Sequence, residues 1–236
     1  DRLRSRGLGD VYKRQNLIYK AAKLMMETYP ISGGVKIHLE KHIPIAAGMA
    51  GGSTDAAATL KGMNRLFDLG CTLKDLMELG VKIGADVPYC VMGGTALAEG
   101  IGEKLTPLAP APDCYVLVAK PDINVSTKYV YEHLDAQEIV KHPDIDGMVE
   151  AIAEESLQGI LDRMENVLET VTVSAYPIIQ TIKDRMKELG AINSLMSGSG
   201  PTVFGIFVEK DMARRAYDKL EEEQLAKQIF LTEFCE

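Results

Sequence analysis

The chain has 236 residues, a formal net charge of −8 and a hydrophobic content of 46%. A chain of this length and composition can bury a substantial core and form one large domain or two small ones. The acidic balance disfavours a nucleic-acid-binding protein, because phosphates require a basic face. No apolar stretch approaches the roughly 20 residues that a membrane span needs, so we expect no membrane partner.

Cysteine and histidine spacing gives no sign of a disulfide framework or a metal site. Four cysteines lie far apart, and none belongs to a C-x-x-C pair: Cys71, Cys90, Cys114 and Cys235. This spacing favours reduced thiols. His38 and His42 are four apart near an expected strand, where that spacing does not bring side chains together, so we assign no metal ligands. Without a secretory leader, we expect a cytoplasmic protein.

Residues 1–15 (DRLRSRGLGDVYKRQ) differ from the rest of the chain. They are basic and aperiodic, they lack an initiator Met, and a helical pattern begins abruptly at Asn16. We expect this segment to be non-native and leave it out of the fold interpretation. On this interpretation, a genuine N-terminal segment has been lost.

Residues 16–111 are predicted to form a first domain of helices and strands. Its elements follow in chain order: a helix over 16–29, a half-buried strand over 35–39, a loop of small residues over 44–53, a helix with N-cap candidates Ser53 and Thr54, a capping-box helix from Thr72 to about Ile83, a break over 84–88, and a hairpin of 95–98 with 103–108. These assignments rest on periods of 3.6 and 2, on N-cap residues and on glycine or proline breaks. Three prolines between 107 and 112 resemble a linker, so we place the domain boundary after residue 111.

Residues 112–236 are predicted to form a second domain. Its elements are a strand over 115–119, a helix from Pro177 to Gly190, strands over 191–196 and 202–208, a helix over 211–223 and a strand over 229–234. The order β, α, β, β, α, β is typical of a ferredoxin-like fold. The predicted fold class is therefore α+β with two domains.

A first glycine cluster, Ala47–Ser53 (AGMAGGS), leads into a predicted helix. Small residues let backbone N–H groups approach an anion, and a helix N-terminus adds partial positive charge, so the pattern indicates a phosphate site. Neither a Walker A loop nor a G-x-G-x-x-G fingerprint is present. Taken alone, the glycines fit a tight turn with close helix packing equally well.

A second glycine cluster, Met196–Thr202 (MSGSGPT), joins two predicted strands and carries two serine hydroxyls. Alone it is typical of a hairpin loop. Two clusters that are rich in N–H and hydroxyl donors, in one acidic chain, favour binding of a triphosphate or a phosphate ester.

Asp86 lies between small residues after a predicted helix and is two residues before Pro88. A carboxylate in such a rigid turn can orient an attacking hydroxyl or accept its proton. A helix-terminating turn residue is the simpler interpretation of this pattern alone.

Several segments in order resemble the GHMP kinases. The segments are 16–22 (NLIYKAA), 44–57 (PIAAGMAGGSTDAA), 84–88 (GADVP), 120–127 and 196–205. The glycine loop alone indicates the family, and the full set resembles a branch that phosphorylates a cytidine diphosphate-linked methylerythritol in non-mevalonate isoprenoid biosynthesis. The resemblance implies a ribosomal-protein-S5-like first domain over 16–111, a ferredoxin-like substrate domain over 112–236, and ATP with Mg2+ as cofactors.

The resemblance also implies roles for individual residues. Asp86 matches the catalytic aspartate. Residues expected to contact the nucleotide are Asn16, Lys41, Pro44, Ala47, Gly48, Met49, Ala50, Gly51, Gly52, Ser53 and Thr54. Residues expected to contact the acceptor, besides Asp86, are Thr127, Tyr131, Ser197, Gly198, Ser199 and Gly200. An aromatic ring at Tyr131 can stack on a base.

The chain departs from the family pattern at its start. Family members begin with a strand that carries a lysine near the reacting groups, and no matching segment is present here. Losing a cation there removes transition-state stabilisation on the order of a hundredfold in rate. We therefore expect the 236-residue chain itself to be inactive or barely folded.

Two alternatives stay open from the sequence. One is another GHMP kinase of the homoserine or mevalonate type, which would share the glycine loop. The other is a non-catalytic nucleotide-binding relative, against which the retention of Asp86 argues. The sequence indicates no oligomeric state.

Overall fold

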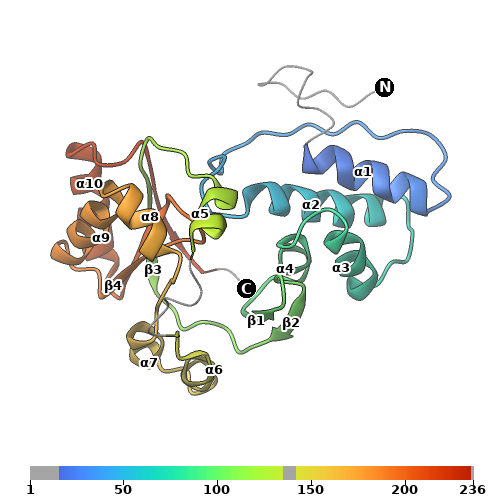
Figure 1. Ribbon diagram of the computed structural model, residues 1–236. Helices are drawn as coiled ribbons and strands as arrows, with labels where there is room; N and C mark the ends of the chain where they lie inside the picture. Colours follow the sequence, from blue (N-terminus) through green and yellow to red (C-terminus); the bar gives the residue numbers. More distant parts are fainter. Residues whose placement is uncertain (1–15, 135–141, 235–236) are drawn as a thin grey trace. The chain divides into compact units, whose positions relative to one another are not determined.

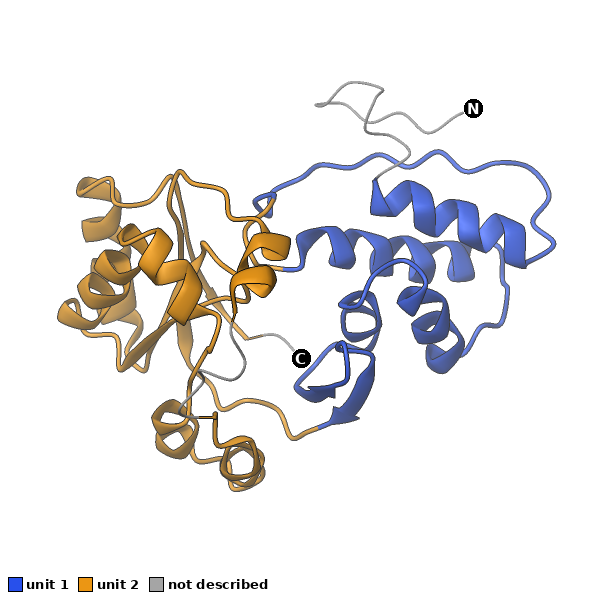
Figure 2. Ribbon diagram, in the orientation of Figure 1, with its two compact units in different colours: residues 1–45, 50–107 blue, residues 46–49, 108–236 orange. Residues whose placement is uncertain are grey.

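The computed structural model describes residues 16–134 and 142–234 and places them in two compact units (Figure 2). Of the described residues, the first unit takes 16–45 and 50–107, and the second takes 46–49 and those from 108 onward. The mixture of helices and sheets confirms the α+β class. The segment 1–15, expected to be non-native, lies outside the described residues. Within the described residues, no helix combines the length and the apolar character that crossing a membrane requires.

The first unit is a helical layer with a small hairpin (Figure 1). Its elements are α1 (Leu17–Thr28), α2 (Gly51–Leu66), α3 (Leu73–Val81), α4 (Val87–Met92), β1 (Ala96–Glu99) and β2 (Lys104–Pro107). Alanines on α1 and α2 allow the two helices to pack closely, and the buried side chains of Met25 and Leu60 fill the space beside them. The predicted hairpin is confirmed, because β1 and β2 pair antiparallel.

Three predictions in this unit need correction. No strand forms over 35–39: side-chain burial alternates there as predicted, because Val35 and Ile37 pack on the helical core, but no described segment pairs with this backbone. Helix α2 begins at Gly51, so Ser53 and Thr54 lie in its first turn and Ala50 is the N-cap residue. The break expected over 84–88 ends at Asp86. Val87 and Pro88 already belong to α4, because proline is tolerated in the first turn of a helix.

The second unit contains the predicted ferredoxin-like sheet. Its strands are β3 (Tyr115–Lys120), β4 (Asn193–Met196), β5 (Val203–Phe207) and β6 (Gln228–Glu233). They lie in the order β4-β5-β3-β6, and every neighbouring pair is antiparallel. The apolar run at 115–119 is confirmed as an internal strand, since β3 lies between β5 and β6 and is almost wholly buried.

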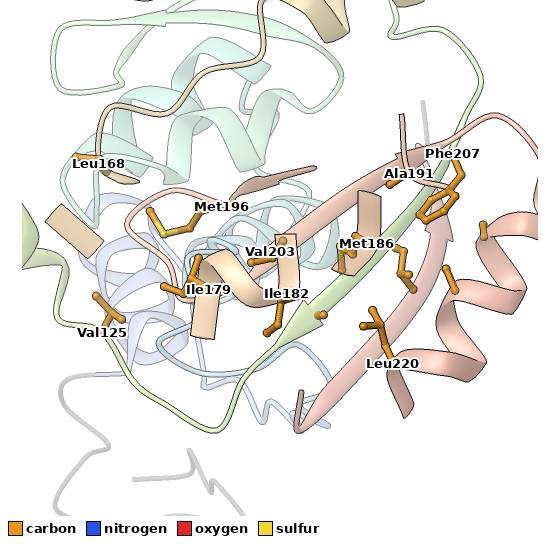
Figure 3. Close-up of a cluster of buried hydrophobic side chains, with 14 of the residues drawn as sticks. Val125, Leu168, Ile179, Ile182, Met186, Ala191, Met196, Val203, Phe207 and Leu220 are labelled. Carbon is orange, nitrogen blue, oxygen red and sulfur yellow. The ribbon is translucent and has the colours of Figure 1, made fainter. Parts of the chain in front are cut away.

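Helices α9 (Ile178–Glu188) and α10 (Lys210–Glu222) pack on one face of this sheet (Figure 3). Their apolar stripes contribute Ile182, Met186 and Leu220 to a fully buried core that also contains Phe207 of β5. Both helices match the predicted ranges to within two residues.

The opposite face of the sheet is covered by part of a long insertion between β3 and α9 that the sequence did not predict. The described residues of the insertion form four short helices: α5 (Thr127–His133), α6 (Ile145–Ala153), α7 (Leu157–Asp162) and α8 (Glu169–Ala175). On this face Val116 and Val118 of β3 pack with Leu161 of α7, and Met49 joins the same cluster. The sheet thereby anchors one residue of the first glycine cluster.

Candidate active site

The first glycine loop (residues 46–53) ends in the N-terminus of a four-turn helix. Ala50 is the N-cap residue of α2, adopts a left-handed conformation with φ of 47°, and makes no side-chain hydrogen bond to the helix. The first N–H groups of any α-helix lack partners within the helix, and they carry partial positive charge. The first turn of α2 therefore offers N–H donors to an anion.

Lys41 secures this first turn from one side. Its Nζ donates to the carbonyl oxygen of Gly51 at 2.7 Å and pairs with Asp55 Oδ2 at 2.5 Å. Gly51 is required here because a Cβ atom would lie 2.8 Å from Cγ2 of Ile43. Since Lys41 holds a carbonyl group, the N–H donors of the turn stay available.

Asp86 lies at the N-cap position of α4, and its exposed carboxylate makes no capping hydrogen bond. Within the described part of the chain this carboxylate has no hydrogen-bond or ion-pair partner. A carboxylate that is not used by the fold can accept a hydrogen bond from a substrate hydroxyl.

Cys90 links Asp86 to the first turn of α2. It lies one helical turn after Asp86, and its backbone N–H donates to the Asp86 carbonyl oxygen at 3.1 Å. Its Sγ lies 3.5 Å from Oγ1 of Thr54, in the first turn of α2. Burial raises the pKa of the Cys90 thiol, and the negative charge of Asp86 raises that pKa further. The Cys90 thiol thus lies against Thr54, one helical turn after Asp86.

The second glycine loop (residues 196–202) is held by a dense set of hydrogen bonds. The Ser197 N–H donates to the Thr202 carbonyl at 2.8 Å, and the Gly200 N–H donates to the Ser197 carbonyl at 2.9 Å. The Asn166 side-chain amide donates to the carbonyls of Met196 and Gly198, both at 2.8 Å. This loop is therefore fixed both by its own backbone hydrogen bonds and by Asn166, which lies outside it.

The second glycine loop holds Gly48 by a hydrogen bond and by close packing. The Ser197 hydroxyl donates to the Gly48 carbonyl oxygen at 2.8 Å. Gly48 has φ of 69°, which disfavours other residues, and a Cβ there would collide with the carbonyl oxygen of Ser197. Only glycine fits this position.

The predicted acceptor residues on α5 and the second loop meet in part. Oγ1 of Thr127 lies 2.8 Å from Oγ of Ser199, which joins α5 to the loop. Tyr131 is 60% exposed on α5, so its side chain is accessible to a stacking partner. Gly198 and Gly200 have positive φ values, 55° and 83°, which shape the loop. Contact of all these residues with the acceptor stays a prediction.

Two predicted nucleotide contacts also have structural functions. Asn16 is the N-cap of α1, and its Oδ1 accepts from the Ile18 N–H at 2.9 Å. Pro44 is buried before the first glycine loop. The other predicted nucleotide residues lie in that loop or the first turn of α2: Ala47, Gly48, Met49, Ala50, Gly51, Gly52, Ser53 and Thr54.

Sequence reasoning missed three residues around the second glycine loop: Asn166, Glu169 and Thr172. The Glu169 carboxylate accepts from the Met196 N–H at 2.7 Å, and the buried Thr172 hydroxyl donates to the Ser199 carbonyl at 3.3 Å. They lie about 30 residues before the loop in an insertion without strong periodicity, so no local pattern indicated them. Among the described residues, no cluster of three or more His, Cys, Asp or Glu side chains could hold a metal ion.

Comparison with known families matches both units. The sequence model described as the GHMP kinases N terminal domain matches residues 16–94, and the one described as GHMP kinases C terminal matches residues 148–227. Together these matches cover more than half of the chain.

Curated relatives extend the match over nearly the whole chain. The 4-diphosphocytidyl-2-C-methyl-D-erythritol kinase of Lachnoclostridium phytofermentans is 56% identical over 94% of this chain and 76% of its own length. The protein of the same name from Lachnospira eligens is 56% identical over 92% of this chain and 76% of its own length.

Solved structures agree with the fold. A crystal structure of 4-(cytidine 5'-diphospho)-2C-methyl-D-erythritol kinase has a TM-score of 0.83 and 34% identity, and the match covers 99% of this chain and 82% of that chain. Homoserine kinase from Cytophaga hutchinsonii has a TM-score of 0.80, with 99% of this chain and 80% of that chain covered. At 22% identity, the second match shows the fold alone.

Proposed function

Because this chain belongs to the GHMP kinases, we propose that it transfers the γ-phosphoryl group of ATP to a hydroxyl of 4-diphosphocytidyl-2-C-methyl-D-erythritol. The product is the 2-phosphate, in non-mevalonate isoprenoid biosynthesis. Relatives that are 50–56% identical over most of the chain carry the name of this kinase, which supports the acceptor over homoserine or mevalonate.

The observation that carries the proposal is the placement of Asp86. Its carboxylate has no partner among the described residues, and the Cys90 thiol one turn later touches Thr54 beside the donor-rich end of α2. A non-catalytic nucleotide-binding protein has no need of such a carboxylate, whereas a kinase uses one at its acceptor.

Phosphoryl transfer depends mainly on positioning and on charge stabilisation. The N–H groups at Gly51–Ser53 bind the phosphate oxygens of ATP and place the γ-phosphorus. Asp86 accepts a hydrogen bond from the acceptor hydroxyl, which orients its oxygen toward that phosphorus and gives its proton a place to go. Lys41 keeps the first turn of α2 in place through the Gly51 carbonyl.

Mg2+ is part of the proposal. Mg2+ usually retains several waters and binds through substrate phosphates with one or two protein oxygens. Ser53 offers a hydroxyl in the first turn of α2 that has no hydrogen-bond partner among the described residues, which suits one such contact. When bound, the ion neutralises charge on the phosphates.

The acceptor is proposed to bind through the second unit. Thr127, Tyr131 and the second glycine loop would hold its cytidine diphosphate part, with the exposed Tyr131 ring against the base. The domains would then be an ATP-binding domain over 16–111 and a substrate domain over 112–236. The free thiols of Cys71, Cys90 and Cys114 support a reducing compartment, for which we propose the cytoplasm.

The test is a substrate panel. Protein expressed from its complete gene is incubated with ATP, Mg2+ and each of three acceptors: 4-diphosphocytidyl-2-C-methyl-D-erythritol, homoserine and mevalonate. We expect phosphorylation of the cytidine substrate alone. Asp86→Asn keeps the size of the side chain and removes its charge, so we expect the turnover rate to fall by roughly 10²- to 10⁴-fold while ATP binding persists.

Asp113→Asn is the matched control, because it removes one carboxylate charge in the loop before β3 and leaves both glycine loops unchanged. Turnover of another acceptor in place of the cytidine substrate would contradict the proposed acceptor. ATP binding without any transfer would favour the non-catalytic alternative.

A further inference from the structure

Two side chains at the start of α8 hold the second glycine loop. Asn166 donates through Nδ2 to the carbonyls of Met196 and Gly198, while its Oδ1 accepts from the Leu168 N–H at 3.0 Å. Three of its hydrogen-bonding positions are therefore used at once, which fixes the amide and the loop carbonyls in one geometry.

Glu169 holds the same loop from an adjacent position. One carboxylate oxygen accepts from the Met196 N–H at 2.7 Å, and the other accepts from Lys183 Nζ at 2.5 Å. The side chains of Lys183 and Glu169 are only 9% and 18% exposed, so this pair is largely desolvated. Met196 thus has its N–H and its carbonyl fixed by two side chains of one turn.

The second glycine loop also restrains Gly48. Ser197, which follows Met196, donates its hydroxyl to the Gly48 carbonyl, and the space between Gly48 and the Ser197 carbonyl admits no Cβ. All of these residues belong to the second unit, which includes residues 46–49. Gly48 is itself part of the first glycine loop and is two residues before the N-cap of α2 in the chain.

We propose that Asn166 and Glu169 are positioning residues for ATP, acting through the second glycine loop on Gly48. This inference rests on the proposed function, in which the first glycine loop binds the ATP phosphates. Neither side chain needs to touch ATP. Their loss would leave the carbonyls of Met196 and Gly198 or the Met196 N–H without partners and would loosen Ser197.

The test compares Asn166→Ala and Glu169→Ala with a matched control, Asn193→Ala. Asn193 has a similar bonding pattern with two bonds instead of three: its Nδ2 donates to the Leu161 carbonyl at 2.8 Å, and its Oδ1 accepts from the next residue's N–H at 2.8 Å. It makes no hydrogen bond to the second glycine loop, so its loss costs similar bonds elsewhere in the unit.

Two readouts separate positioning from general stability. The first is steady-state kinetics, in which we expect the KM for ATP to rise roughly 5- to 30-fold for Asn166→Ala and Glu169→Ala. For both variants the acceptor KM should stay within about twofold. The second is amide hydrogen exchange, which should accelerate in 46–49 as well as in 196–200. Asn193→Ala should leave the KM for ATP and the exchange in 196–200 unchanged.

Glu169→Gln provides the rescue. Its amide oxygen can still accept from the Met196 N–H, so the KM for ATP should return to within about twofold of the unchanged protein, although Lys183 loses its ionic partner and thermal stability falls. Faster exchange in 196–200 with unchanged exchange in 46–49 would overturn the proposal, as would an equal rise of both KM values. If the unchanged protein does not phosphorylate the acceptor, the proposed function fails, and the exchange result still decides the positioning proposal.

Discussion

The two glycine loops are each secured by a lysine–carboxylate pair with an N–O separation of 2.5 Å, but opposite members of the pair reach the loop. At the first loop the cation, Lys41, donates to the Gly51 carbonyl. At the second loop the anion, Glu169, accepts from the Met196 N–H. The first arrangement leaves the N–H donors of the first loop free, whereas in the second arrangement the Met196 N–H of the second loop is already hydrogen-bonded.

This difference indicates a division of labour. A loop that binds anions must keep its N–H groups available, so it can be held only through carbonyl groups or through neighbouring side chains. A loop that supports another loop can use both kinds of backbone group. Glycine content alone does not distinguish these two cases, whereas the direction of the hydrogen bonds does.

The largest effect is expected from disturbing the contact between the two glycine loops at Gly48 and Ser197. Gly48→Ala introduces a Cβ at a φ of 69° and against the Ser197 carbonyl. We expect kcat/KM for ATP to fall on the order of a hundredfold, because the first glycine loop, which is proposed to bind the ATP phosphates, is displaced at Gly48. Steady-state kinetics would measure the loss.

Gly70→Ala is the matched control for backbone strain. Gly70 has a φ of 66°, close to that of Gly48, but a Cβ there meets nothing within 4 Å. We expect a cost of about 1–2 kcal/mol in the free energy of unfolding, with kinetics unchanged. Equal kinetic losses in the two variants would show that strain, and not the contact with Ser197, explains the effect.

A second experiment replaces each of the two lysines, in separate variants, by methionine. Lys41→Met removes the bond to the Gly51 carbonyl and leaves the Asp55 charge beside the first turn of α2. We expect the KM for ATP to rise roughly tenfold, because an unpaired carboxylate repels phosphate and the turn loses its support. Isothermal titration with ATP would give the matching change in affinity.

Lys183→Met is the counterpart at the second loop. Glu169 still accepts from the Met196 N–H, so the KM for ATP should stay within about twofold. Loss of its ionic partner should lower the free energy of unfolding by about 2 kcal/mol, or the Tm by roughly 4–8 °C. If Lys183→Met weakened ATP binding as much as Lys41→Met, the division of labour between the loops would be wrong.

Sequence patterns predicted the parts of this molecule whose cause is local. The capping box at Thr72 and Asp75, the hairpin at 96–107 and the internal strand at 115–120 all depend on neighbouring residues or on continuous burial, and all three are confirmed. The strand expected over 35–39 was wrong because strand formation depends on a partner that local alternation does not reveal.

The candidate site shows the same limit. Both glycine loops were recognised from composition, but the lysine–carboxylate pairs join residues 14 positions apart, and Ser197 reaches Gly48 across 149 positions. Such contacts depend on tertiary structure alone. Asn166 and Glu169 lie in an insertion without a regular pattern, so no sequence signal distinguished them from surface polar residues.

The smallest expected effect comes from the capping box of α3, which lies outside both glycine loops. Changing it should alter stability and leave ATP binding unchanged. The Thr72 hydroxyl and N–H donate to Asp75 and lower the pKa of that carboxyl, and the Asp75 N–H donates to the Thr72 hydroxyl. Thr72→Ala should lower the Tm by roughly 2–4 °C and leave the KM for ATP unchanged. Thermal unfolding and steady-state kinetics would measure the two values.

The pH dependence of this effect has a defined sign. Because the folded pKa of Asp75 is lowered from 3.8, its stabilising contribution is full above that value and is lost as the pH falls through the folded pKa. The Tm difference between Thr72→Ala and the unchanged protein should therefore be larger at pH 6 than under strongly acidic conditions. Asp75→Asn should remove that dependence, since it has no charge to titrate. A pH-independent difference would mean that the cap acts through the Asp75 N–H bond alone.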